Sequence, residues 1–215
     1  MAMTTVRICS DNIWNAIITI EKGMNFLSQT IQSQVKISPD ILQEIVSHFE
    51  RVEVPRKAKL VQAGEVAQKL ACIEKGYLRM YKIDPEGNET TIWIGGPGKF
   101  ITSISSFIHQ KPSLWNIEAL TPGEVYLIKR DSHFQLCEFY REWLDFENLL
   151  LSKALDALEF RTYELMSLKA EDRLRLLFER NPQLLLDVPA KYIASLLGIT
   201  EETMSRLKKN TRYFS

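Results

Sequence analysis

The stretch "KYIASLLGITEETMSRLKKN", residues 191–210, decides the architecture of the end of the chain. Ile193, Leu196 and Leu197 share one helical face, and Gly198 then supplies a turn conformation that other residues resist. Thr200 is a suitable N-cap for a second helix, whose first turn carries two glutamates. Two short helices around a glycine turn predict a helix-turn-helix, a unit that lays its second helix in the major groove of DNA.

The second helix of this pair is expected to have an inner and an outer side. Met204 and Leu207 would face inward. Arg206 can donate two hydrogen bonds to a guanine edge, and Glu202 can accept one from a cytosine amino group. Other outer residues suit phosphates better. The residues predicted to contact DNA are Thr200, Glu202, Thr203, Ser205, Arg206 and Lys209.

The charge of the chain is balanced overall but not locally. Lysine and arginine total 27, as do aspartate and glutamate, so the formal net charge is zero. After Glu202, however, the chain carries Arg206, Lys208, Lys209 and Arg212 and no acid. Because local charge governs nucleic-acid binding, this end predicts double-stranded DNA as a partner. The alternative is an effector-binding protein whose terminal helices bind a protein partner.

The middle of the chain has the pattern of a β domain. Short β-branched and aromatic runs, separated by glycine and proline, extend from about residue 51 to 129 and indicate antiparallel strands. The segment Asp84–Asn88 is a typical hairpin connection. Ser38 and Pro39 begin a preceding helix. We expect an N-terminal extension over 1–36, with Met24 as an alternative start, and a β-roll sensor domain over 37–131.

Residues 132–168 contain neither proline nor glycine and predict a long helix. Apolar spacings of four and three along it are typical of a coiled-coil seam. The seam consists of Leu151, Leu155, Leu158, Thr162 and Leu165. We expect a homodimer through this helix, although a helix packed only on its own β domain remains open. Residues 169–215 are then the helix-turn-helix domain.

Composition excludes several classes of protein. Hydrophobic residues make up 45% and charged residues 25%, and no apolar run reaches the ~20 residues that span a bilayer. Cys9, Cys72 and Cys137 lack disulfide or metal spacing and favour a reducing cytoplasm. His48 and His109 stand isolated in the sequence, as does His133, so we expect no metal site, no catalytic residues and no enzyme.

The order of helix, β-roll, long helix and helix-turn-helix resembles the Crp/Fnr family of bacterial transcription regulators. The resemblance covers about Ile37 to Asn210 and is strongest in "AEDRLRLLFERNPQLLLDVPAKYIASLLGITEETMSRLKK". It implies an α+β fold: an antiparallel β-roll (a double-stranded β-helix of the cyclic-nucleotide-binding kind), a long dimerisation helix and a small helix-turn-helix domain. RNA polymerase is a candidate further partner.

The same resemblance bears on the DNA-reading residues. Glu202 and Arg206 stand where the catabolite-activator members place base-reading residues. Glu201 stands where those members carry a further basic residue, so the same operator is not expected. The chain also ends before a normal wing would form after the recognition helix.

A ligand cassette of the family is altered here. Cyclic-AMP-binding members resemble one another in a glycine and glutamate, followed later by an arginine and a hydroxyl residue. Thr102 and Ser103 stand at the first two positions, and Ser113 and Leu114 at the second two. A buried phosphate would lack its cation and pay a large desolvation penalty. We expect a degenerate pocket, no cyclic AMP or other cofactor and an unidentified effector; a true cyclic-nucleotide receptor is the alternative.

Four aromatic residues of the β domain have two possible roles. They are Trp93, Phe100, Phe107 and Trp115. They could line an apolar pocket or form plain core, and both readings stay open at this point.

Overall fold

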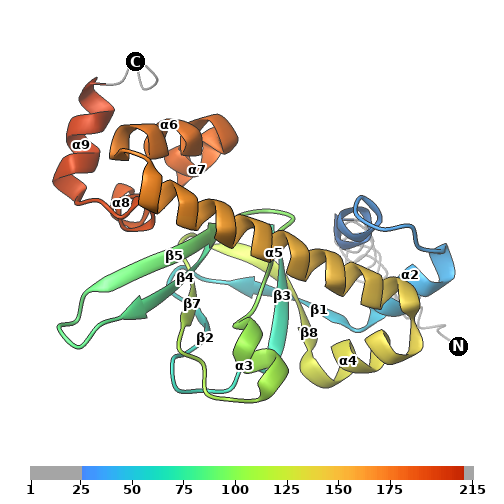
Figure 1. The fold of residues 1–215 in the computed structure, drawn as a ribbon. Coiled ribbons are helices and arrows are strands. Elements are labelled where there is room, and N and C mark those ends of the chain that lie inside the picture. The colour runs from blue at the N-terminus through green and yellow to red at the C-terminus, as the bar shows by residue number, and fades with distance from the viewer. Residues whose placement is uncertain (1–25, 211–215) are drawn as a thin grey trace, which may run out of the picture.

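The computed structural model describes residues 26–210, as a two-sheet β domain crossed by a long helix that leads to a group of short helices (Figure 1). The expectations for Cys9, Met24, Arg212 and the wing lie outside these residues. The strands are β1 (Phe49–Val54), β2 (Lys59–Val61), β3 (Lys69–Lys75), β4 (Leu78–Ile83), β5 (Glu89–Gly95), β6 (Phe100–Ile101), β7 (Asn116–Ala119) and β8 (Gly123–Lys129).

The strands form two antiparallel sheets of four. One has the order β1-β8-β3-β6 and the other β2-β7-β4-β5. Non-consecutive neighbours such as β3 and β8 make this a roll rather than a meander. Buried side chains of both sheets, among them Ile73, Leu78, Ile117 and Val125, fill the space between them. The predicted α+β class with an antiparallel β-roll is therefore confirmed.

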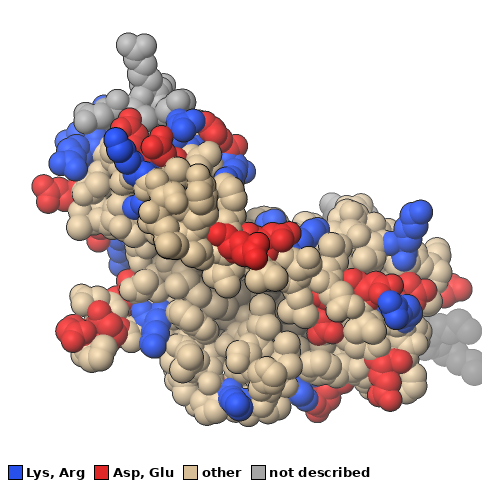
Figure 2. All heavy atoms as spheres, in the orientation of Figure 1, with Lys and Arg blue, Asp and Glu red and all other residues tan. Residues whose placement is uncertain are grey.

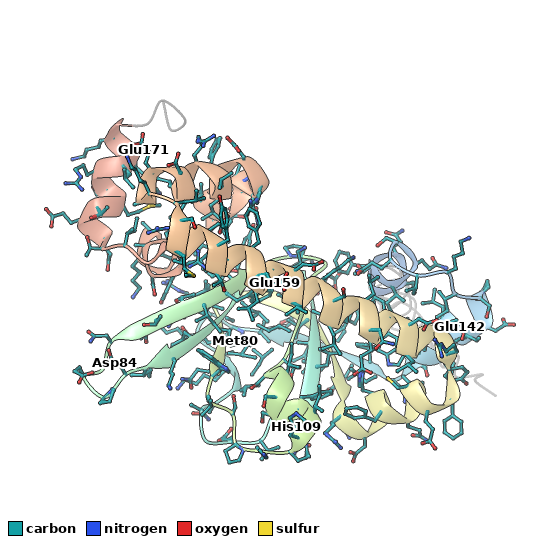
Figure 3. All side chains as sticks on the ribbon, viewed as in Figure 1. Met80, Asp84, His109, Glu142, Glu159 and Glu171 are labelled. Carbon is teal, nitrogen blue, oxygen red and sulfur yellow. The ribbon has the colours of Figure 1, made fainter. Side chains whose placement is uncertain are left out.

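The β4–β5 hairpin follows from its loop chemistry. Asp84 accepts a hydrogen bond from the Asn88 backbone N–H at 2.8 Å, and Gly87 adopts a positive φ of 88°. Pairing of Ile83 with Glu89 closes the hairpin. Figure 3 shows Asp84 at the hairpin tip, away from the long helix. The hairpin matters for function because its β5 strand meets the helical end of the chain.

Helices cover the outside of the roll. Residues 26–32 are helical, and α2 (Pro39–Ser47) begins with Ser38 accepting from the Ile41 N–H at 3.4 Å. The short α3 (Ile104–His109) lies within the β domain. Helix α2 buries Leu42, Ile45 and Val46 against the core.

The expected single helix over 132–168 is instead two helices. They are α4 (Arg130–Phe139) and α5 (Arg141–Ser167), separated at Tyr140, whose φ of −122° and ψ of 109° are extended. The break lets α4 bury His133 and Leu136 while α5 buries Trp143 and Phe146 in the same core. A straight helix could not bring both apolar faces onto one roll. Residue patterning alone did not show this, because neither glycine nor proline marks the bend.

Four short helices follow α5 in the described part of the chain. They are α6 (Ala170–Arg180), α7 (Pro182–Asp187), α8 (Ala190–Leu197) and α9 (Glu201–Asn210). Leu174, Leu184, Ile193 and Met204 form their common core. That core also includes Tyr77 of the β domain, with Leu120, so the helical end packs on the roll.

Candidate functional site

Helix α9 presents its polar side to solvent. Met204 is buried, while Glu202, Ser205, Arg206 and Lys209 are exposed. Thr200 is exposed and Thr203 is half-buried. Residues three, four and seven apart share a helical face, so Glu202, Arg206 and Lys209 form one ridge. The predicted DNA-contacting residues thus lie together on an accessible surface.

The turn before α9 has the local chemistry expected of it. The Thr200 hydroxyl accepts from the Thr203 backbone N–H at 3.1 Å, which makes Thr200 the N-cap. Gly198 has a φ of 64°, in the left-handed region that glycine adopts without strain. The Ile199 N–H then closes the end of α8 by donating to the Ala194 carbonyl at 3.0 Å. These bonds fix the angle at which α9 leaves α8.

Charges at this end of the molecule are mixed. Figure 2 shows lysine and arginine side chains over the α9 end of the molecule, with acidic side chains close by. Arg206 and Lys209 are exposed, and Glu201 and Glu202 occupy the first turn. A surface that binds a DNA groove here would depend on the C-terminal half of α9, which carries the basic residues.

A buried arginine of the roll contacts the helical end of the chain. Arg79 of β4 is 2% exposed, and its guanidinium lies 2.5 Å from a Glu89 carboxylate oxygen and 2.6 Å from one of Glu118. It stacks 3.7 Å from the ring centroid of Tyr81 and 4.3 Å from that of Tyr192 in α8. Arginine suits this place because its planar group can pair and stack at once.

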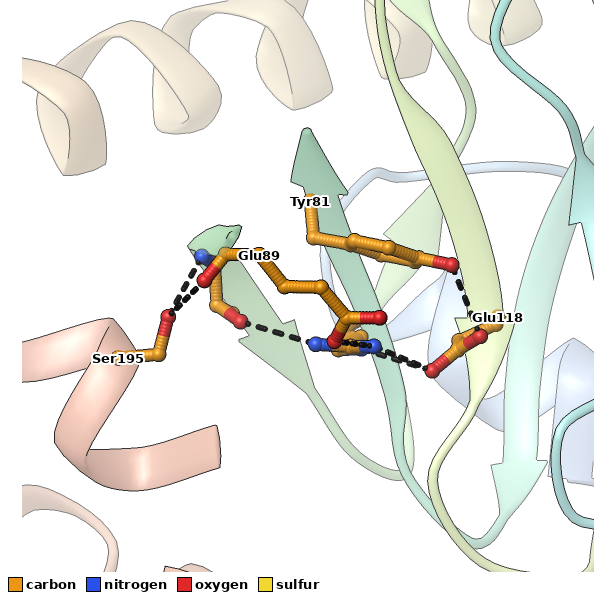
Figure 4. A network of polar contacts seen from close by, with 6 residues as sticks. Tyr81, Glu89, Glu118 and Ser195 are labelled. Carbon is orange, nitrogen blue, oxygen red and sulfur yellow. Dashed lines mark hydrogen bonds and ion pairs between the residues drawn. The ribbon is translucent and has the colours of Figure 1, made fainter. Parts of the chain in front are cut away.

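Ser195 of α8 makes direct hydrogen bonds to the roll. Its hydroxyl accepts from the Thr91 backbone N–H at 2.9 Å and donates to the Glu89 carbonyl at 3.1 Å. It thereby extends the edge of β5 (Figure 4). Neither Ser195 nor Arg79 was identified from the sequence. A charged residue inside the alternating strand "YLRMYKI" was a signal for Arg79, but its partners are distant in sequence.

Helix α5 exposes apolar side chains along much of its length. Leu155 is 56% exposed and Leu158 61%, and Leu151, Leu165 and Thr162 of the predicted seam are exposed as well. Such a stripe on a single chain is unusual for a surface helix. Glu159 lies on the same helix (Figure 3). The single chain therefore leaves the predicted seam uncovered.

A cavity of about 740 Å³ lies between the roll, α5 and the helical end. Its wall includes Trp93, Phe100, Phe107 and Trp115, which favours the apolar-pocket interpretation of these aromatic residues. Figure 2 shows the surface hollowed below α5. The cavity is of a size that accommodates a small molecule.

The altered cassette lies at this cavity without a charged anchor. Thr102 and Ser103 border it and are buried. Ser113 is buried beside Ser103 and Leu114 is 65% exposed, and neither is part of the wall. The arginines of the wall come from helices instead, and Arg161 of α5 is one of them. Burial lowers the pKa of the Arg161 guanidinium.

Three side chains that can each offer a ligand atom to a metal ion lie together where α4 meets α5. His133, which the sequence presents as isolated, lies 2.9 Å from Glu147 and 3.7 Å from the Cys137 sulfur. The hydrogen bond from His133 lowers the pKa of the Glu147 carboxyl, and burial raises that of the Cys137 thiol. His48 pairs with Glu44, and His109 is exposed at the end of α3 (Figure 3).

Comparisons with known proteins agree with this architecture. Residues 51–140 match the family model of the cyclic nucleotide-binding domain. FixK2 from Bradyrhizobium japonicum aligns at a TM-score of 0.66 with 21% identity, covering 75% of this chain and 83% of its own. A protein from Eubacterium rectale assigned to the Crp/Fnr family of transcriptional regulators aligns at 0.63 with 16% identity, covering 81% and 83%. This chain has a Crp/Fnr-type fold.

A further structural neighbour is CLP, the c-di-GMP-responsive global regulator of Xanthomonas campestris. It aligns at a TM-score of 0.62 with 19% identity, covering 80% of this chain and 91% of its own. No curated protein matches this sequence. Between residues 26 and 210, no helix combines the length and apolar character needed to cross a membrane. The resemblance noted in the sequence is thus confirmed for the Crp/Fnr-type fold.

Proposed function

We propose that this protein is a homodimeric, sequence-specific DNA-binding transcription regulator. The observation that carries the proposal is the α9 ridge, where Glu202, Arg206 and Lys209 are exposed while Met204 anchors the helix from below. A single α-helix fits the major groove, where base edges differ in their donors and acceptors. In this proposal Arg206 and Glu202 read bases, and Thr200, Thr203, Ser205 and Lys209 bind phosphates or adjust the fit.

Dimerisation through α5 supplies the second ridge. The exposed leucines of the predicted seam, Leu155 and Leu158 among them, would be covered by the same helix of a second copy. Two recognition helices related by a two-fold axis would enter successive major grooves roughly 34 Å apart. The target is therefore expected to be palindromic. This role places the protein in the cytoplasm, with RNA polymerase as a candidate further partner and no catalytic residues.

The sensor cavity is proposed to take a mainly apolar effector rather than a cyclic nucleotide. Most of the residues that line the cavity are apolar. Ser103 and Ser113 stand at the two positions where the family resemblance places the charged anchors. A cyclic phosphate bound in the family's usual mode would have no cation beside it. Calorimetry with cyclic AMP and cyclic GMP should detect no binding; binding of either would replace this proposal with a cyclic-nucleotide receptor.

Selection of bound sequences from random duplex DNA tests the main proposal. The wild-type chain should enrich a palindromic sequence, with affinity that falls steeply as salt is raised. Arg206→Ala should weaken specific binding by roughly 10- to 100-fold and relax the preference at one base pair in each half-site. Arg175→Ala is the matched control, since Arg175 pairs with Asp172 and Glu179 on α6.

Two results would contradict DNA reading by α9. One is the absence of any enriched sequence, and the other is unchanged preference in Arg206→Ala. Retention of a cellular protein by the same ridge, together with absent DNA selection, would support the alternative in which the terminal helices bind a protein partner.

A further inference from the structure

The cluster of His133, Cys137 and Glu147 differs from an ordinary ion pair in its chemistry. A nitrogen, a sulfur and a carboxylate oxygen converge from two helices, and their candidate ligand atoms all lie within 4.8 Å of one another. His133 is 2% exposed and the other two side chains are partly buried. In the part of the chain that the structure describes, this is the one group of three or more histidine, cysteine and acidic side chains close enough together to hold a metal ion.

The helices explain why these residues meet. His133 and Cys137 are four residues apart on α4, so they lie on the same face. The chain reverses at Tyr140, and α5 then carries Glu147 back against that face. His133 and Cys137 are four residues apart and Glu147 follows ten residues later, a spacing that matches no familiar metal motif. The sequence alone therefore does not predict the cluster.

The distances between the three candidate ligand atoms are close to those around a tetrahedral cation. Zinc binds sulfur at roughly 2.3 Å and nitrogen or oxygen at roughly 2.0–2.2 Å, which places tetrahedral ligand atoms about 3.3–3.6 Å apart. The Cys137 sulfur lies 3.5 Å from a Glu147 oxygen and 3.7 Å from the His133 Nε2. The nitrogen and oxygen, at 2.9 Å, would separate by a few tenths of an ångström.

The ionic balance of the cluster also suits a divalent cation. A Cys137 thiolate and a Glu147 carboxylate together carry two negative charges, and neutral His133 adds none. Without a cation, protons on the thiol and on Nε2 must hold the three groups together. The Nδ1 atom of His133 is buried without a hydrogen-bond partner, whereas Nε2 lies 2.9 Å from Glu147. A metal at Nε2 would place the ring proton on Nδ1, so the gain from metal binding must exceed the cost of a buried N–H without an acceptor.

The surroundings leave one coordination position accessible. The aromatic rings of Phe107, Phe134 and Trp143 lie 5.1–5.6 Å from the His133 ring and exclude water from most sides. His133 and Glu147 nevertheless border the sensor cavity. We propose that His133, Cys137 and Glu147 bind a zinc-like divalent cation whose fourth position opens to the cavity, where water or a donor atom of an effector completes the shell.

Cobalt(II) titration of the full-length, metal-stripped protein is the direct test. Binding of one ion per chain should produce the visible spectrum of tetrahedral cobalt together with a thiolate charge-transfer band, and excess zinc should displace it. Cys137→Ala should abolish the charge-transfer band while leaving Cys72 in place. Glu147→Gln, which keeps the side-chain shape, should weaken zinc binding by at least about tenfold.

The chain offers a matched control in its second histidine–glutamate pair. His48, which caps the C-terminal end of α2, lies 3.3 Å from Glu44, and in the described part of the chain this pair belongs to no group of three candidate metal ligands. Glu44→Gln should therefore leave the cobalt spectrum and the zinc affinity unchanged. Circular dichroism of each variant establishes that it is folded before its affinity is compared.

Three outcomes would overturn the metal site: no tetrahedral cobalt spectrum, a charge-transfer band that survives Cys137→Ala, or equal zinc affinity in folded Glu147→Gln and wild-type protein. These measurements use no DNA. Their failure therefore leaves the proposed regulatory role standing, and a failure of DNA selection leaves the metal site standing.

Discussion

The Ser113 hydroxyl oxygen lies 2.9 Å from that of Ser103, and these are the two positions where the cyclic-AMP-binding relatives are expected to carry arginine and glutamate. Both side chains are at most 3% exposed. Ser113 also lies 2.8 Å from the Trp115 carbonyl and accepts from the Trp115 N–H at 3.0 Å. Two small hydroxyls thus bond to each other at the positions where the sequence resemblance predicts a charged pair in cyclic-AMP-binding members.

Replacement of Ser113 by alanine should destabilise the β domain. Ser113→Ala leaves the Trp115 N–H and the Ser103 hydroxyl without their partner, and a buried polar group left unpaired costs about 1–3 kcal/mol. Denaturant unfolding followed by tryptophan fluorescence measures the change. Ser105→Ala, at an exposed position of α3, should change stability by less than about 0.5 kcal/mol. Equal stability of the two variants would contradict this account of the serine pair.

Truncation of Arg79 should be among the most damaging single substitutions in the described chain. Arg79→Met leaves Glu118, itself buried, without its cation, and breaking a buried pair costs about 3–5 kcal/mol. Arg141→Met removes an exposed pair with Asp145 and should change stability by about 0–1 kcal/mol. Thermal unfolding distinguishes the two. A small loss of stability in Arg79→Met would mean that the Glu118 carboxylate becomes hydrated or protonated in the variant.

Tyr81 should make stability fall at alkaline pH. Burial and the nearby Glu118 carboxylate raise the pKa of the Tyr81 hydroxyl to about 12, against roughly 10 in the unfolded chain. Its contribution is therefore complete below pH ~10 and is lost as pH rises towards ~12. Unfolding free energies across that window should decline less steeply in Tyr81→Phe. Tyr163→Phe, at an exposed position of α5, should keep the wild-type slope.

Removal of the Ser195 hydroxyl should loosen the helical end from the roll. Ser195→Ala deprives the Thr91 N–H of its acceptor and the Glu89 carbonyl of its donor. Hydrogen exchange at the Thr91 amide should accelerate, because opening there no longer breaks this bond. Ser205→Ala, on the exposed side of α9, should leave that exchange rate unchanged. Unaltered protection of Thr91 in Ser195→Ala would show that the Ser195 hydrogen bonds do not hold the helical end on the roll.

A charge on the α5 stripe should separate the proposed dimer. Leu155→Glu places like charges opposite each other at a two-fold seam and should shift sedimentation equilibrium to the monomer. Asp156→Lys, one residue along and off the seam, should remain dimeric. A Leu155→Glu protein that sediments as the wild type does would locate any interface elsewhere.

Local pattern was sufficient for much of this protein. The β-roll strands, the Asp84–Asn88 hairpin and the Thr200 cap follow from side-chain periodicity and turn chemistry acting within a few residues. The exposed side of α9 follows likewise from helical spacing. These features depend on neighbours in sequence, so the sequence by itself determined them.

Only the tertiary structure decided which distant residues meet. The reversal at Tyr140, the Arg79 stack on Tyr192 and the meeting of His133 with Glu147 each join elements whose relative placement depends on how their apolar faces share one core. The periodicity of apolar residues predicts which face of a helix or strand is buried, but not which element covers that face. The tertiary packing therefore decides which charged or polar side chains from different elements contact one another.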